Sequence, residues 1–80
     1  MTTISISAAT IQTIALDDIA TQAKESAAAL LAQGWDPASG PYDLGAFSGD
    51  REALAERLGH EPTRDQCREL ERQIRAALAA

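Results

Sequence analysis

Alanine supplies seventeen of the eighty residues of this chain, and valine is absent. Alanine favours helices more than any other residue, whereas valine and the other β-branched residues favour strands. The large apolar side chains are few, with six isoleucines, eight leucines and one each of Met, Cys, Trp, Tyr and Phe. The chain is therefore expected to form a single domain, 1–80, whose helices approach closely because its side chains supply little bulk.

The first helix is expected over 17–33. At about 100° per residue, one face of this segment collects an apolar stripe made of Ile19, Ala20, Ala23, Ala27, Leu30 and Leu31. Asp17 or Asp18 would cap the start of the helix, where a carboxylate also meets the positive end of the helix dipole. Gly34 would end it, because glycine adopts the left-handed conformation that terminates many helices.

Two further helices are expected over 49–58 and 64–79. Gly59 would stop the first of them. Thr63 and Gln66 have the spacing of a capping box at the start of the second, in which each side chain bonds the backbone N–H of the other residue. The apolar stripe of this last helix consists of Cys67, Leu70, Ile74, Ala77 and Leu78.

Residues 2–16 show a different pattern, in which Ile4 and Ile6 alternate with threonine and serine. Such alternation is typical of a short strand, and 10–16 would supply a second strand if the segment forms a hairpin. An extra helical turn that begins at Ser7 is the alternative. The predicted fold is thus mostly α, an α-dominated α+β architecture of three helices with a short N-terminal strand or hairpin.

The segment 34–48, which we call the aromatic loop, contains two prolines and three glycines and so excludes regular structure. It holds all three aromatic residues of the chain, which are Trp35, Tyr42 and Phe47. The rings either fold over the helices and enlarge a core that lacks bulk, or serve as anchors for a binding partner, as Trp and Tyr often do. Rings that hold the loop would also fix Asp36 and Asp43, which lie between them.

The net charge of −5 is confined to the first half of the sequence. Residues 1–50 hold six acidic residues against one lysine, whereas residues 51–80 hold six acids and six arginines. An acidic surface repels nucleic acid and favours a basic partner. Four of the arginines form a row along the last predicted helix: Arg64, Arg68, Arg72 and Arg75. Acids three and four positions away favour helix-surface ion pairs over a phosphate-binding row.

The sequence offers little for catalysis or metal binding. It has one histidine, His60, in an expected turn, and one cysteine, Cys67, on an expected buried stripe, so we expect no catalytic residue and no enzyme. Two such residues do not supply a zinc site, and the aspartate spacing does not fit a calcium loop, so no metal or cofactor is expected. No run of eighteen apolar residues occurs, which argues against a membrane span, and the lone cysteine favours a reducing, cytoplasmic setting.

The segment 51–63 resembles the first half of a DNA-binding helix-turn-helix, with Ala55 and Gly59 at the positions that this motif requires. Asp65 and Arg68 stand where the second half of the motif has buried aliphatic side chains, so the likeness ends there. It implies an alternative function, a small transcriptional or toxin–antitoxin regulator that binds DNA as a dimer.

The leading hypothesis is a small acidic inhibitor or adaptor that docks on a basic protein surface. In size, acidity and lack of catalytic groups the chain resembles the phage-encoded anti-CRISPR proteins, several of which block the DNA-binding surface of a CRISPR effector complex. This resemblance implies a basic protein or such a complex as the partner of a monomer or homodimer, without direct contact to nucleic acid. It implies a partner-binding set of aspartate phosphate mimics and aromatic anchors: Asp17, Asp18, Trp35, Asp36, Tyr42, Asp43 and Asp50.

Overall fold

Helix α1, which spans Thr2–Ala32, is the longest element in the computed structural model of the protein. The structure describes the backbone of residues 2–79 and the side chains of residues 15–79 except Ser39. The elements after α1 are the short 3-10 helices η1 (Pro37–Ser39) and η2 (Leu44–Ala46) and the helices α2 (Ser48–Leu58) and α3 (Arg64–Ala79). No strand occurs among residues 2–79, so the predicted mostly α fold with three helices is confirmed.

The strand or hairpin predicted over 2–16 is wrong, because these residues form the first half of α1. The helix start predicted at Asp17 or Asp18 is wrong for the same reason, since both residues lie inside α1. Once a helical turn exists, each added residue gains one hydrogen bond, and the alanine-rich second half of α1 favours such turns. A strand over 2–16 would instead leave its N–H and C=O groups without a sheet partner.

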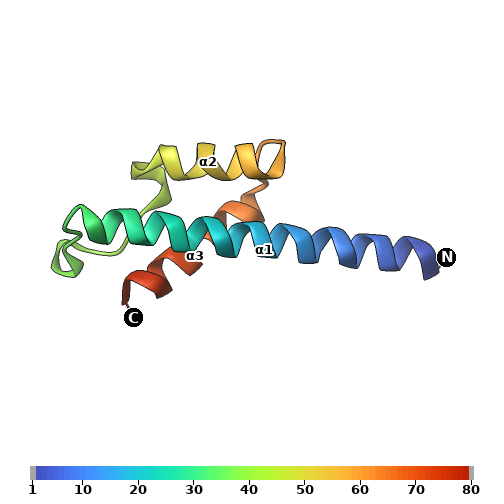
Figure 1. The fold of residues 1–80 in the computed structure, drawn as a ribbon, viewed down its shortest axis with the longest axis horizontal. Coiled ribbons are helices and arrows are strands. Elements are labelled where there is room, and N and C mark those ends of the chain that lie inside the picture. The colour runs from blue at the N-terminus through green and yellow to red at the C-terminus, as the bar shows by residue number, and fades with distance from the viewer. Residues whose placement is uncertain (1, 80) are drawn as a thin grey trace.

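Helices α2 and α3 lie on different sides of the second half of α1 (Figure 1). In this view α2 runs antiparallel above α1, whereas α3 crosses α1 and ends below it. The first half of α1 extends beyond both neighbours, which gives the molecule Cα extents of 50 × 23 × 18 Å. The aromatic loop lies at the opposite end of the long axis, around the C-terminal end of α1 (Figure 1).

The core lies where α1 meets α3 and α2. Its α1 residues follow the predicted stripe and are Ile19, Ala23, Ala27 and Leu30. Helix α3 contributes Leu70, Ile74 and Leu78, and α2 contributes Leu54. Leu31, predicted on the stripe, is 53% exposed and lies outside the core. Two of the four α1 core residues are alanine, so the helices pack with little side-chain bulk between them.

The C-terminal end of α1 forms a Schellman motif at the predicted glycine. Gly34 has a φ of +88°, its N–H donates to the carbonyl of Leu31 at 3.1 Å, and the N–H of Trp35 donates to the carbonyl of Leu30 at 3.0 Å. These two bonds satisfy carbonyl groups that the helix leaves unpaired. They also turn the chain so that Trp35 packs against the core.

The C-terminal end of α2 and the start of α3 follow the predicted signals as well. Gly59 ends α2 with a φ of +79°, and its N–H donates to the carbonyl of Ala55 at 2.9 Å. Before α3, the N–H of Thr63 donates to Oε1 of Gln66 at 2.9 Å, and the N–H of Gln66 donates to Oγ1 of Thr63 at 3.1 Å. This reciprocal pair is the predicted capping box.

Candidate functional site

The three rings of the aromatic loop contact one another. The ring centroids of Tyr42 and Phe47 are 5.2 Å apart in a stacked arrangement, and Trp35 lies 6.4 Å from Tyr42 and 6.1 Å from Phe47. Tyr42 is only 1% exposed, whereas Trp35 and Phe47 are half-buried against the core. The rings therefore enlarge the core, and Tyr42 belongs to the interior rather than to an exposed anchor.

Two side chains of α3 hold the backbone of the aromatic loop. Nε of Arg75 donates to the carbonyl of Tyr42 at 2.7 Å, and the N–H of Leu44 donates to Oε2 of Glu71 at 3.0 Å. Arg75 and Glu71 also form an ion pair, with 3.5 Å between Nη2 and Oε1. Sequence reasoning missed this role, because a spacing of four predicts only a surface pair and the loop partners are 27 and 33 positions away.

Asp36 and Asp43 are exposed on the aromatic loop, and the backbone that follows holds each carboxylate. Oδ1 of Asp36 accepts from the N–H of Ala38 at 2.9 Å at the start of η1. Oδ1 of Asp43 accepts from the N–H of Gly45 at 3.0 Å at the start of η2. Aspartate is a preferred residue for such N-cap contacts. The two carboxylates therefore have defined positions on the surface of the loop.

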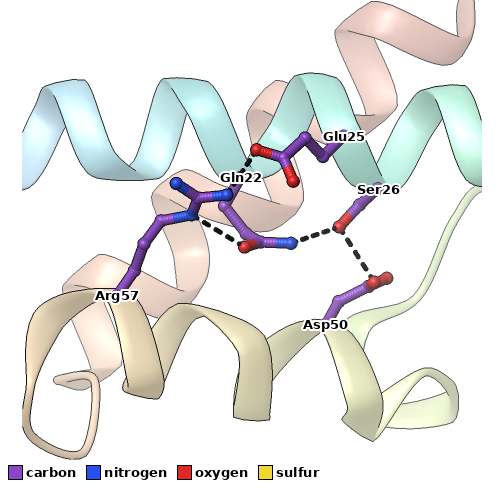
Figure 2. Close-up of polar contacts among 5 residues, drawn as sticks. All are labelled: Gln22, Glu25, Ser26, Asp50 and Arg57. Atoms are coloured by element: carbon purple, nitrogen blue, oxygen red, sulfur yellow. Dashed lines mark hydrogen bonds and ion pairs between the residues drawn. The ribbon is translucent and has the colours of Figure 1, made fainter.

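Asp50 turns inward. Its Oδ2 accepts from the hydroxyl of Tyr42 at 2.6 Å, and its Oδ1 accepts from the hydroxyl of Ser26 at 2.9 Å. Figure 2 shows the second of these contacts, which joins the first turn of α2 to α1. Both oxygens of Asp50 are thus used to fasten α2 and the aromatic loop to α1, so this predicted partner-binding residue serves the fold.

The polar contact between α1 and α2 continues along both helices (Figure 2). Nε2 of Gln22 donates to Oγ of Ser26 at 3.0 Å, and Nε of Arg57 donates to Oε1 of Gln22 at 3.1 Å. Arg57 also forms an ion pair with Glu25. Gln22 and Ser26 are buried, and in the described part of the chain every buried side-chain nitrogen and oxygen has a partner. Burial of these polar groups is therefore compensated.

The pKa of Tyr42 is raised far above its usual value. Burial is the main cause, because it disfavours the charged phenolate, and the hydrogen bond to Asp50 adds to the effect. The nearby carboxylates of Glu71 and Asp43 act in the same direction. The hydroxyl of Tyr42 therefore stays protonated and remains the donor to Asp50.

Asp17 and Asp18 lie apart from the aromatic loop. Asp17 is exposed and Asp18 is half-buried. At about 1.5 Å per residue, the helix between Asp18 and its C-terminal end is about 21 Å long. The predicted partner-binding residues do not form one face, since only Asp36 and Asp43 are exposed on the loop, next to the half-buried Trp35.

The arginine row on α3 is partly paired. Arg72 pairs with Glu69 and Arg75 pairs with Glu71, as the helical spacing predicts. Arg64 and Arg68 are exposed, and no ion pair of theirs occurs among the side chains of residues 15–79. The first two arginines of the row are therefore more available to a binding partner than the last two, which are already in ion pairs.

The single histidine and the single cysteine lie in different surroundings. His60 is exposed in the turn after α2, and its Nδ1 lies 2.8 Å from the carbonyl oxygen of Glu61. The thiol of Cys67 is half-buried and packs against the core. Over the described residues, no group of three His, Cys, Asp or Glu side chains is placed to hold a metal ion. None of the helices among residues 2–79 combines the length and apolar character that crossing a membrane requires.

Comparison of the chain with models of known protein families, with curated proteins and with solved structures gave no match.

Proposed function

We propose that the protein is a small acidic inhibitor that binds a basic, nucleic-acid-binding surface of a partner protein through the exposed part of the aromatic loop. The observation that carries the proposal is the pair of exposed carboxylates of Asp36 and Asp43, each held by a backbone N–H. The packed rings fix the loop that carries them. Such preorganised groups lose little conformational freedom on binding.

The class of partner follows from charge. A protein surface that binds nucleic acid presents arginines and lysines toward phosphates, and fixed carboxylates can occupy the same positions. The net charge of −5 would steer the protein toward such a surface and keep it from nucleic acid itself. A CRISPR effector complex is one partner of this kind, so the protein would act in the cytoplasm as a DNA mimic, in the manner of anti-CRISPR proteins.

The test replaces both loop aspartates by asparagine. Asparagine keeps an oxygen for the N-cap contacts, so Asp36→Asn with Asp43→Asn removes charge and leaves the turns in place. We expect capture of basic partners from host lysate, and inhibition of DNA binding by a purified CRISPR effector complex, to weaken about tenfold. Rising salt should weaken the wild-type interaction in the same way.

The matched control is Glu52→Gln with Glu56→Gln. These glutamates are exposed one turn apart on α2, outside the aromatic loop, and their loss changes the net charge equally. The control should bind as the wild type does. Equal weakening in both double variants would show that only net charge matters, and unchanged binding in the loop variant would contradict the proposal.

A second candidate function, the DNA-binding regulator, is favoured by the exposed and unpaired arginines among residues 15–79, Arg64 and Arg68 at the start of α3. They come directly after the segment 51–63, which resembles the first half of a helix-turn-helix. A gel shift with duplex DNA at moderate salt separates the two functions. Retarded DNA that is released by Arg64→Gln with Arg68→Gln would favour the regulator over the inhibitor.

A further inference from the structure

A groove separates the aromatic loop from the C-terminal end of α3. Trp35, Pro37 and Pro41 line one side of it, and Arg75, Leu78 and Ala79 line the other. Its volume is about 380 Å³, which is in the range of sites that hold a small ligand or a large side chain. The indole, the two proline rings and the leucine make its walls mainly apolar.

The charge around this groove favours a cation. Among the described residues that line it, Arg75 alone has a charged side chain, and the carbonyl of Tyr42 and the carboxylate of Glu71 already engage its guanidinium. Asp36 is exposed between two lining residues of the loop. The last carbonyl groups of α3 lack partners within the helix and carry the negative end of its dipole. The carboxylate beside the groove and the carbonyl groups at the end of α3 therefore favour a cation over an anion.

We infer that the groove binds an arginine side chain of the partner, whose alkyl stem lies between Trp35 and Leu78. The stem is apolar and matches the walls, while the guanidinium remains at the polar rim near Asp36. A guanidinium also stacks favourably on the face of an indole. The inference rests on the proposed function, because it names the chemistry by which a basic partner is recognised at the aromatic loop.

The test uses N-acetyl-arginine methylamide as the probe and its citrulline counterpart, which has the same shape without the charge. Trp35 is the only tryptophan of the chain, so its indole N–H resonance and its fluorescence report directly on the groove. The arginine probe should shift the indole resonance saturably, with a Kd on the order of a millimolar. The citrulline probe should bind about fivefold more weakly.

Two variants of the full chain locate the binding. Ala79→Phe fills the groove and should abolish the shift, whereas Ala76→Phe, on an exposed position of the same helix that does not line the groove, should preserve it. Asp36→Asn should reduce binding of the arginine probe about threefold and leave the citrulline probe unaffected. Circular dichroism and thermal melts verify that each variant folds.

The inference is overturned if the arginine probe gives no saturable shift, if citrulline binds equally well, or if Ala79→Phe binds as the wild type does. Failure of the probe, together with loss of partner binding in the Asp36/Asp43 double variant, would leave the proposed function standing without the groove. Saturable probe binding, with partner binding unchanged in that double variant, would instead retain the groove and overturn the proposed function.

Discussion

Helix α1 meets its two neighbours with different chemistry. Toward α3 it presents the apolar stripe that begins at Ile19, which packs against residues such as Ile74. Toward α2 it presents Gln22 and Ser26, which reach Arg57 and Asp50 through hydrogen bonds (Figure 2). The first contact is buried and draws on apolar area removed from water, whereas the second is part-buried and draws on polar groups that satisfy one another.

This difference in chemistry gives the two contacts different roles: the apolar contact supplies stability, and the polar contact fixes the position of α2 along α1. Apolar surfaces attract without direction, so several offsets of one helix along the other cost little in area. Hydrogen bonds require aligned atoms, and a buried donor left unpaired is costly, so the polar contact selects one placement of α2. Because Asp50 also binds the hydroxyl of Tyr42, that placement fixes the aromatic loop.

The apolar contact is tested by Ile74→Ala. Ile74 is fully buried, and the truncation should reduce the free energy of unfolding by ~2–4 kcal/mol. For eighty residues that is a large share of a total of roughly 4–12 kcal/mol. Urea unfolding followed by circular dichroism measures the change, with Arg68→Ala on the exposed face of α3 as control. If Ile74→Ala lowered the free energy of unfolding no more than Arg68→Ala does, the α1–α3 contact would not be the main source of stability.

The polar contact is tested by Asp50→Asn. The amide keeps one acceptor oxygen but turns a donor group toward either Tyr42 or Ser26, both of which donate, and should cost ~1–3 kcal/mol. In a double-mutant cycle with Tyr42→Phe, the double variant should lose less stability than the two single variants lose together. Both substitutions remove the same hydrogen bond, the one between Tyr42 and Asp50. Fully additive losses would show that the hydroxyl and the carboxylate do not interact.

Alkaline pH tests the same contact without mutation. The folded pKa of Tyr42 is raised, so the stabilisation linked to its proton is complete below the ordinary tyrosine pKa of about 10 and is lost as pH rises above it. Since the chain has one tyrosine, near-ultraviolet absorbance follows this ionisation alone. Tyrosinate should form in the same transition in which helical circular dichroism is lost. Ionisation of a still folded chain near the ordinary value would place Tyr42 outside the core.

The smallest effect on stability is expected from the ion pair between Arg72 and Glu69 on the surface of α3. The Arg72 hydrogen bond, with help from Gln73, holds the pKa of Glu69 below its usual value. A lowered pKa means that the stabilisation is present above the ordinary glutamate value and is lost as pH falls through the lowered one. Arg72→Gln should move the NMR titration midpoint of Glu69 upward and barely change stability at neutral pH. An unchanged midpoint would show that the pair is absent in solution.

Local patterns predicted the parts of the fold that depend on neighbours in sequence. The capping box of Thr63 and Gln66, the glycine at the end of each of the first two helices, and the stripe of α3 all depend on contacts within a few residues. The strand over 2–16 was wrong because a period-2 pattern carries no information about whether a second strand exists to pair with it. Helix cooperativity decided the conformation instead.

The candidate site was predicted less completely for a related reason. The gathering of the aromatic rings follows from their spacing on one loop, and so does the exposure of Asp36 and Asp43. That Asp50 faces inward depends on Ser26, which lies 24 positions earlier, and on a tyrosine whose burial the sequence leaves open. Composition alone treats the five aspartates of the predicted partner-binding set as equivalent, and only the packing distinguishes them.

The reactivity of the half-buried thiol of Cys67 can be used to detect local opening of the fold. Cys67 sits on the side of α3 that packs against the core, and it is the chain's only cysteine. Because the core covers part of this residue, we expect alkylation of Cys67 to be faster when α3 moves away from the core than in the closed fold. The labelling rate of the native protein, compared with that of the unfolded chain, therefore reports local opening of this contact.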